Sequence, residues 1–233
     1  MQHKPNVSVI IPVYNESGNA APLAVEISNA LAEYAPYEVI FVDDCSTDDT
    51  LAELDKIMSM DPNVRICAHA RNRGQSASVR TGILAASAEV IAILDGDGQN
   101  DPKDIPGLLD QFTSTPGISL IIGERQNRQD AWIRKLSSRV ANSVRSFVLG
   151  DGINDAGCGL KVFNREEFLN LPAFDHMHRF LPALMRQDGH EVRSMPVNHR
   201  PRLRGQSKYG VNNRLWVGVV DMLGVIWLKR RRL

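Results

Sequence analysis

Short apolar runs separated by turn residues divide the first half of the chain into regular segments. Five runs are rich in β-branched residues and predict buried strands, over residues Val7–Val13, Tyr37–Asp43, Val64–Ala70, Val90–Leu94 and Ile118–Gly123. Between them apolar residues recur three or four positions apart, as at Leu23, Ile27 and Leu31, which predicts helices. Strands that alternate with helices predict an α/β fold, with a mostly parallel sheet covered by helices on both faces.

A longer helical pattern covers residues 131–149 in the second half. Apolar residues such as Ile133 and Val140 share one face, and Arg134 and Ser138 lie four positions apart on another. Such a face can present a row of cations to a ligand. The alternative from the pattern alone is an ordinary amphipathic helix whose arginines are solvated.

The segment Leu215–Leu228 is nearly all apolar, but Asp221 and two glycines interrupt it and basic residues follow it. A membrane-spanning helix needs roughly 20 apolar residues, so the segment is too short to span comfortably. It predicts an interfacial helix, with Trp216 and Trp227 at the level of the lipid headgroups. A core helix or a helix that forms a homo-oligomer is the alternative. We therefore expect one domain over residues 1–209, followed by this helix and a basic tail over residues 210–233.

Charge is distributed unevenly along the 233 residues, although the formal net charge is zero. Residues 1–120 hold 7 Lys and Arg against 17 Asp and Glu, whereas residues 121–233 hold 20 against 10. This suits a cation-binding half joined to an anion-binding or membrane-facing half. Cys45, Cys67 and Cys158 form no CxxC pair, which argues against a disulfide framework or a zinc site and favours the reducing cytosol.

Acidic residues follow three of the predicted strands, where ligands bind in parallel sheets. Asp95 and Asp97 come directly after Val90–Leu94, with Gly96 and Gly98 beside them to let backbone approach a ligand. Two carboxylates at one strand end suit a hard cation such as Mg²⁺, which takes its remaining ligands from substrate phosphates and water. The alternative is an acidic surface turn, which the preceding apolar strand makes less favourable.

Asp43 and Asp44 end the second predicted strand. Their candidate roles are to bind a nucleotide or to shape the turn that leads into the next helix. Asp48 or Thr47 suits the helix cap better, which leaves Asp44 free for a ligand.

Four segments in order, IIPVYNE, VDDCSTDDT, LDGDGQNDP and GCGLKVFNRE, resemble family 2 glycosyltransferases over nearly the whole chain. The later segment RLRGQSKYG resembles the branch that contains dolichyl-phosphate mannose synthase and bacterial polyprenyl-phosphate sugar transferases. The resemblance implies a GT-A catalytic domain that transfers a hexose, with inversion, from GDP-mannose or a UDP-sugar to undecaprenyl or dolichyl phosphate.

The resemblance also implies site residues. It places the metal, Mg²⁺ or Mn²⁺, at Asp95, Asp97 and Gln99, and the acceptor phosphate at Arg134 and Ser138. Gly96 stands where alanine is more usual. The implied nucleotide-sugar residues are Pro12, Tyr14, Glu16, Val42, Asp44, Asp95 and Gly96, and Arg125 matches a further active-site arginine.

The stretch from Asn198 to Arg214 carries several cations and no acid. Arginine pairs bidentately with phosphate oxygens and lysine adds a point charge, so Arg202 and Lys208 are expected to bind the leaving diphosphate or the acceptor. Nucleic-acid binding is the competing interpretation. We do not favour it, because Tyr209 is the only Phe, Tyr or Trp in this stretch and the whole chain is neutral.

Asp155 lies where a general base would be sought. A phosphate monoester has a second pKa of about 6, so an acceptor phosphate needs placement rather than deprotonation. If the acceptor is instead a saccharide hydroxyl, as in a family 2 enzyme of surface polysaccharide synthesis, Asp155 becomes indispensable. A non-catalytic nucleotide-sugar-binding or receiver-like module is the alternative outside enzymes. A peripheral position on the cytoplasmic face of a membrane is expected.

Overall fold

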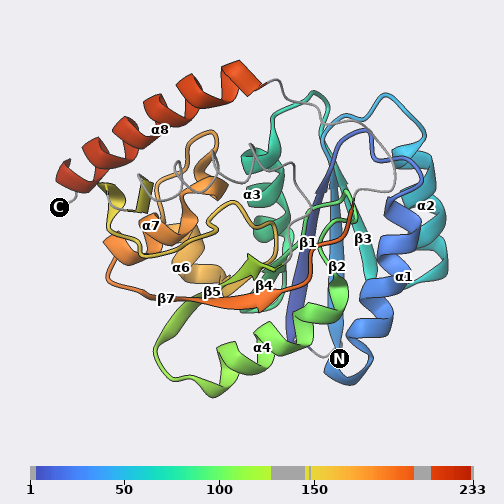
Figure 1. Cartoon of the computed structure of the whole chain (residues 1–233). Coiled ribbons are helices and arrows are strands. Elements are labelled where there is room, and N and C mark those ends of the chain that lie inside the picture. The colour runs from blue at the N-terminus through green and yellow to red at the C-terminus, as the bar shows by residue number, and fades with distance from the viewer. Residues whose placement is uncertain (1–3, 127–144, 147, 202–210, 232–233) are drawn as a thin grey trace.

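The computed structural model describes residues 4–126, 145–146, 148–201 and 211–231. Within them, seven strands form one sheet in the order β3-β2-β1-β4-β6-β5-β7 (Figure 1). The strands are β1 (Val7–Val13), β2 (Tyr37–Asp43), β3 (Val64–Ala68), β4 (Val90–Ile93), β5 (Ile118–Arg125), β6 (Lys161–Asn164) and β7 (Glu191–Val197).

All strands but β6 run in the same direction. β1 pairs in parallel with β2 and β4, β2 with β3, and β5 with β7. β6 lies between β4 and β5 and is antiparallel to both. The predicted mostly parallel sheet is confirmed. The carboxyl ends of six strands and the amino end of β6 therefore meet at one edge, which we call the carboxyl edge.

Helices cover both faces of this sheet. In Figure 1, α3 lies on one side of β1 and β2, and α1 and α2 lie on the other. The helices are α1 (Ala20–Ala30), α2 (Thr50–Met60), α3 (Gln75–Ala85), α4 (Ile105–Ser114), α6 (Arg165–Asn170), α7 (Leu181–Gln187) and α8 (Val211–Arg231), with 3₁₀ turns η1 (Ala32–Tyr34), η2 (Pro102–Asp104) and η3 (Met177–Arg179).

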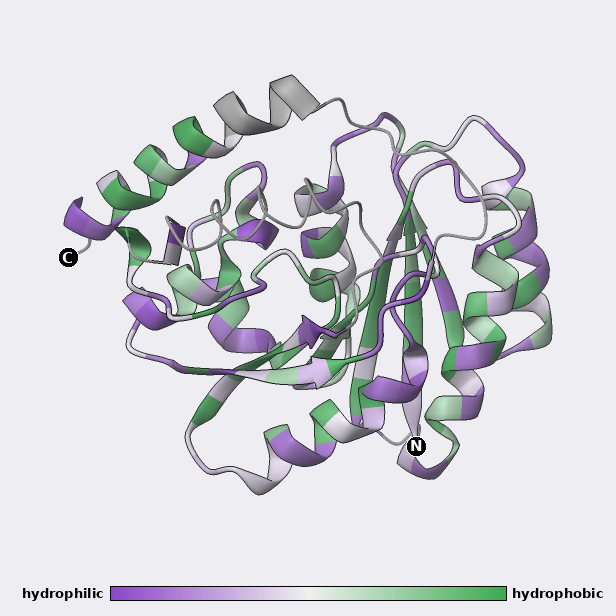
Figure 2. Ribbon diagram, viewed as in Figure 1, coloured by the Kyte–Doolittle hydropathy of each residue, from purple (hydrophilic) through white to green (hydrophobic). Residues whose placement is uncertain are grey.

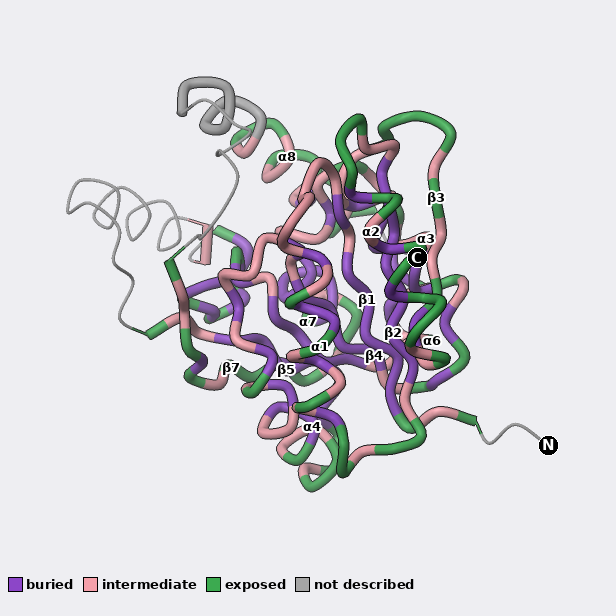
Figure 3. The backbone as a smooth tube through the Cα atoms, turned by 90° about the vertical axis from the view of Figure 1, so that its right-hand side faces the viewer, coloured by how far each residue is buried: buried purple, intermediate pink, exposed green. Residues whose placement is uncertain are grey.

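The core lies in the central strands, which Figure 3 shows as buried. Consecutive residues Val9, Ile10 and Ile11 are all fully buried, as expected for a strand that is covered on both faces. α3 packs tightly here, because a Cβ at Gly82 would lie 2.3 Å from Cγ2 of Ile10. A glycine is therefore needed at position 82 for α3 to approach the sheet this closely.

The strand predictions hold best in the first half. β1 and β2 have the predicted bounds, β3 and β4 end slightly earlier than predicted, and β5 extends to Arg125. The sequence analysis missed β6 and β7. β6 has four residues and begins with a lysine, and β7 exposes Glu191, Arg193 and Ser194, so neither is a continuous apolar run.

The predicted C-terminal helix is confirmed as α8, and its inner face packs against the rest of the fold. Val225 is fully buried, and Met222 and Ile226 pack against the core. Asp221, which interrupts the apolar segment, pairs with His176, whose Nδ1 lies 2.9 Å from Oδ2 of the carboxylate. Across the described ranges, the structure holds no helix with enough length and apolar character to cross a membrane.

Residues on the outer face of α8 remain exposed. Val220, Leu223 and Trp227 are 64%, 59% and 58% exposed, and Lys229 begins the basic end of the helix. Figure 2 shows bands of apolar residues along α8, which give way to polar residues at its C-terminus. The guanidinium of Arg231 lies over the Trp227 ring, 6.0 Å from its centroid. The side chain of Trp216 lies outside the described residues.

Candidate active site

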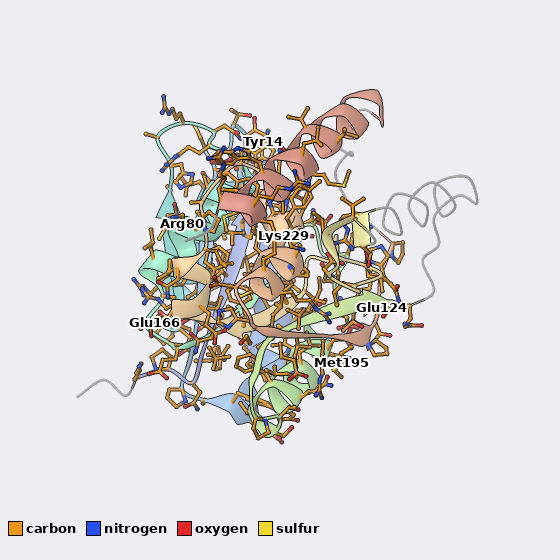
Figure 4. The ribbon with its side chains drawn as sticks, turned by 90° about the vertical axis from the view of Figure 1, so that its left-hand side faces the viewer. Tyr14, Arg80, Glu124, Glu166, Met195 and Lys229 are labelled. Carbon is orange, nitrogen blue, oxygen red and sulfur yellow. The ribbon has the colours of Figure 1, made fainter. Side chains whose placement is uncertain are left out.

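The carboxyl edge brings distant segments of the chain together. β4 ends at Ile93, which pairs with Lys161 at the start of the antiparallel strand β6. Asp95 and its neighbours therefore lie beside the segment from Gly157 to Lys161. Figure 4 shows Tyr14, just after β1, at the upper end of the molecule, and Glu166, just after β6, far below it.

Asp95 is held in a desolvated position at this edge. Its Oδ1 accepts a hydrogen bond from Nε2 of Gln75, at 2.8 Å. Burial raises the pKa of Asp95 to about 6, and the nearby charge of Asp97 adds to the effect, whereas Lys161 and Arg125 oppose it. Such a carboxylate gains strongly from a bound cation.

Two glycines allow this position. A Cβ at Gly159 would lie only 2.1 Å from Oδ2 of Asp95, and a Cβ at Gly96 would lie 2.6 Å from Cγ1 of Val13. Real Cβ atoms do not approach other atoms so closely, so larger residues would displace Asp95 or the loop that follows it. Gly96 is thus needed for packing against β1, and the expectation that it lets backbone approach a ligand stays a prediction.

Asp97 and Gln99 lie in the turn after Asp95. The backbone N–H of Gln99 donates to Oδ1 of Asp97 at 3.1 Å, and the carbonyl of Gln99 accepts from the N–H of Arg200 at 2.8 Å. A small pocket beside this turn is lined by Asp97, Gly98 and residues of α1. The turn is thus fixed between α1 and the segment that follows β7.

The donor set at this edge fits a hard cation. No group of three or more His, Cys, Asp and Glu side chains comes together as a metal site within the part of the chain that the structure describes. Asp95 and Asp97 supply two carboxylates, which is the number that Mg²⁺ takes when substrate phosphates and water complete its shell. The pair therefore suits a cation that arrives with a diphosphate.

Asp44 is not free, contrary to the sequence-based expectation. Its Oδ1 accepts from Nδ1 of His69 at 2.7 Å and from the backbone N–H of Arg73 at 2.8 Å. Its Oδ2 accepts from the N–H of Gly74, also at 2.8 Å. The carboxylate thus organises the loop that leads into α3, and its contact with a nucleotide stays a prediction.

The N-cap residue of α2 is Asp49, and its side chain makes no capping hydrogen bond, so the prediction that Asp48 or Thr47 occupies this position is wrong. Asp48 lies one residue earlier, and its Oδ1 accepts from the backbone N–H of Thr50, the first residue of α2, at 3.0 Å. Asp43 accepts hydrogen bonds from the backbone and the hydroxyl of Ser46. Asp43 and Asp48 therefore shape the turn after β2.

The predicted nucleotide residues lie next to this turn. Pro12 of β1 and Val42 of β2 are register partners in the parallel pair. Tyr14 follows β1, and Glu16 accepts from Nδ2 of Asn19 at 2.8 Å. These four residues are brought to the same end of the sheet, as the sequence predicted, and their contacts with a nucleotide remain to be tested.

Arg125 and Asp155 form the most closely defined pair at the edge. Nε and Nη2 of Arg125 donate to the two carboxylate oxygens of Asp155, each at 2.7 Å. Burial alone lowers the pKa of Arg125, but the hydrogen bonds and charge of Asp155 raise it above its ordinary value. Asp155 itself is buried. The pair holds the guanidinium of Arg125 in a fixed orientation, and the positive charge of Arg125 acts on Asp95.

Lys161 is a charged residue that sequence analysis did not single out. It is almost fully buried, its ammonium donates to the carbonyl of Cys158, and burial lowers its pKa. The negative charges of Asp95 and Asp155 act in the opposite direction. Its signal in the sequence is its place inside GCGLKVFNRE, one of the segments that carry the family resemblance.

One cation of the stretch from Asn198 to Arg214 has carboxylate partners within the fold. Arg200 donates to Oε2 of Glu26 at 2.6 Å and to Oδ1 of Asp101, so it ties α1 to the turn after β4. Burial acts to lower the pKa of Arg200, but these two carboxylates raise it overall. Four predicted phosphate-binding residues lie outside the described residues: Arg134, Ser138, Arg202 and Lys208.

Comparisons with known proteins show which proteins this chain resembles. The model of the family described as "Glycosyl transferase family 2" matches residues 8–170. The chain is 34% identical over 229 residues to a dodecaprenyl-phosphate galacturonate synthase of Rhizobium johnstonii, covering 96% of this chain and 67% of that protein. It is 33% identical to an undecaprenyl-phosphate 4-deoxy-4-formamido-L-arabinose transferase of Sodalis glossinidius, covering 88% of this chain and 63% of that protein.

A solved structure shares the fold at lower identity. Glucosyl-3-phosphoglycerate synthase from Mycobacterium tuberculosis, in complex with Mg²⁺ and uridine-diphosphate, superposes with a TM-score of 0.73 over 97% of this chain and 79% of that one. The sequence identity is 18%. The same enzyme has been solved with Mn²⁺, uridine-diphosphate-glucose and phosphoglyceric acid.

Proposed function

The chain belongs to glycosyl transferase family 2, and we propose that it transfers a hexose from a nucleotide-sugar to a polyprenyl phosphate. The observation that carries the acceptor class is the similarity, over 96% of the chain, to an enzyme named for dodecaprenyl phosphate. The chain spans about two thirds of the length of that relative and slightly less of the next. The activity is therefore proposed for this chain rather than carried over from them.

Asp95 and Asp97 are the proposed ligands of Mg²⁺ or Mn²⁺, and Gln99 is their proposed neighbour in this role. When bound, the cation neutralises charge on the leaving diphosphate. The setting of Asp95 supports the proposal, because burial and the neighbouring charge of Asp97 both disfavour its ionised form, and a cation would offset these effects. Pro12, Tyr14, Glu16, Val42 and Asp44 remain the proposed residues of the nucleotide pocket.

Arg125 is the proposed partner of the acceptor phosphate. Two of its five N–H groups already donate to Asp155, and this bidentate pair fixes the plane of the guanidinium. A phosphate that approaches the other edge of the guanidinium meets a preorganised positive charge. Arg134, Ser138, Arg202 and Lys208 stay predictions for the acceptor and the diphosphate.

Asp155 is proposed to position Arg125 rather than to act as a base. Both of its carboxylate oxygens accept hydrogen bonds from Arg125, so the carboxylate is oriented towards the guanidinium. A phosphate acceptor, with a second pKa of about 6, is largely ionised at neutral pH and attacks the anomeric carbon without a base. The resemblance to the family implies inversion at that carbon.

A membrane surface is the proposed location of the reaction, on its cytoplasmic face. The exposed apolar residues of α8 and its basic end suit insertion at the headgroup level of an anionic bilayer. The cysteines Cys45, Cys67 and Cys158 are all free thiols, which supports the reducing compartment. A lipid acceptor lies in the membrane, so binding at this surface would bring the enzyme to its acceptor.

The test incubates purified protein and Mn²⁺ or Mg²⁺ with a panel of GDP- and UDP-sugars, with and without a short polyprenyl phosphate. Mass spectrometry follows the lipid-linked sugar. We expect transfer that needs both the metal and the lipid phosphate and that is lost in Asp97→Ala. Asp55→Asn, at an exposed site on α2, is the control that keeps activity. Transfer to saccharide hydroxyls alone would overturn the acceptor assignment.

A further inference from the structure

The N-terminus of α3 meets three different parts of the molecule through three consecutive residues. The N–H of Gly74 donates to Oδ2 of Asp44, and Nε2 of Gln75 donates to Oδ1 of Asp95, both at 2.8 Å. The hydroxyl of the next residue, Ser76, lies 2.7 Å from Nδ1 of His178. One turn of chain thus links the end of β2, the proposed metal site and the η3 turn.

This turn is held rigidly. Gly74 has a φ of +83°, a conformation that residues with a side chain rarely adopt, and its N–H is fixed by Asp44. Gly82 lets α3 pack directly on Ile10 of β1. Because β1 pairs with β4, the strand that leads into Asp95, the Gln75 side chain starts from a point that is fixed relative to that carboxylate.

Both oxygens of the Asp95 carboxylate have close neighbours in the fold. Oδ1 accepts from Gln75, and Oδ2 lies over Gly159, where no Cβ is present. The contact from Gln75 is made by a neutral amide, so it orients the carboxylate without cancelling its charge. Lys161, by contrast, acts on Asp95 through its positive charge.

We propose that Gln75 is a positioning residue for the metal-binding carboxylate of Asp95. It holds the side chain in the orientation that receives the cation, so less ordering is required when the metal-nucleotide arrives. The inference rests on the proposed function of Asp95. Removing the partners that orient metal ligands typically lowers metal affinity by about 10- to 100-fold.

Two substitutions separate positioning from packing. Gln75→Leu and Gln75→Met both keep much of the volume but lose the donor, and Gln75→Met also keeps the length of the side chain. If Gln75 positions Asp95, the apparent affinity for Mn²⁺ falls about 10- to 100-fold in both variants. A merely structural role predicts that Gln75→Met, the closer match in shape, binds Mn²⁺ like the wild type.

The measurement is Mn²⁺ binding followed by electron paramagnetic resonance in the presence of UDP or GDP, which needs no acceptor and no turnover. Wild type that binds no Mn²⁺ under either condition would overturn the metal site itself. Wild-type binding that is lost in Asp97→Asn but unchanged in Gln75→Leu would overturn the positioning role alone. Gln187→Leu, at the end of α7, is the matched control, and thermal unfolding checks that every variant is folded.

Discussion

The guanidinium of Arg125 and the carboxylate of Asp155 face each other with two parallel hydrogen bonds of 2.7 Å. The backbone N–H of Arg125 adds a third bond to the same carboxylate, at 3.2 Å. Arg125 ends β5, and Asp155 lies in the loop before β6, so the pair joins two segments at the carboxyl edge. Asp155 therefore acts most directly by holding the guanidinium of Arg125 in place.

The first prediction concerns how effects at this pair combine. We expect Arg125→Gln to lower kcat/KM by about 10²- to 10³-fold, because a preorganised charge is lost. Asp155→Asn should lower it by a smaller factor, and the double variant should be no slower than Arg125→Gln alone. If Asp155 were instead an independent base, the two effects would multiply. Activities are compared below the lowest melting temperature, since breaking a buried pair also destabilises the fold.

The second prediction concerns the position beneath Asp95. Gly159→Ala places a Cβ 2.1 Å from Oδ2 of Asp95, so the carboxylate must move away from its present position. We expect metal-dependent transfer to fall at least 100-fold, with a weaker response to Mn²⁺. Gly157→Ala is the matched neighbour, because its Cβ meets Nη2 of Arg125 at an ordinary 3.7 Å. Equal losses in the two variants would contradict the packing argument.

The third prediction concerns the outer face of α8. Leu223→Glu should weaken binding to vesicles that contain phosphatidylglycerol about tenfold or more, since burying a leucine contributes roughly 1.5–3 kcal/mol. Raising the salt concentration should weaken wild-type binding too, because it screens Lys229 and the arginines after it. Sedimentation with vesicles measures both effects.

Met60→Glu is the control for this experiment. Met60 is 78% exposed at the end of α2, so the substitution adds the same charge to an apolar surface residue elsewhere. If Met60→Glu weakens binding as much as Leu223→Glu, the effect reflects net charge, and α8 is not the membrane contact.

The fourth prediction concerns pH and stability. Burial, together with the positive charges of Lys161, Arg179 and His176, lowers the pKa of His178 well below its ordinary value of 6.5. Below about pH 6.5 the unfolded chain binds a proton that the folded chain does not bind. The stabilising contribution of neutral His178 is therefore complete above that pH and is lost as the pH falls, by up to about 1.4 kcal/mol per pH unit.

Urea unfolding at pH 7.5 and pH 5.5 checks this expectation. His178→Asn does not titrate and keeps an acceptor for Ser76 near the position of Nδ1. We expect the wild type to lose more unfolding free energy between the two pH values than this variant does. Equal losses in both proteins would show that His178 is protonated equally in the folded and unfolded chains.

Much of this fold could be predicted from local patterns. β1, β2 and β4 are buried on both faces, so their apolar runs are continuous and mark the strand ends where Asp43, Asp44 and Asp95 lie. β7 could not be found in this way, because it exposes polar residues along its length. The place of β6 between β4 and β5 depends on pairing between distant segments, which no local pattern encodes.

The site could be predicted to a similar extent. The carboxylates of Asp95 and Asp97 follow from their place after a buried strand, whereas Gln75 and Gly159 contact Asp95 only because α3 and β6 pack beside β1 and β4. Asp44 illustrates the opposite error. Its position predicted a free carboxylate, but the loop before α3 supplies backbone N–H groups that occupy it.

The reversed strand β6 also has a consequence for the order of folding. β1 to β4 are joined by short connections along residues 7–93 and can pair with little cost in loop-closure entropy. β6 must close a much longer loop, since Ile93 pairs with Lys161, and it lies between β4 and β5. A chain that has formed only its first four strands would therefore expose the acidic loops before Gly159, Lys161 and Asp155 reach them, so the carboxyl edge would be completed late.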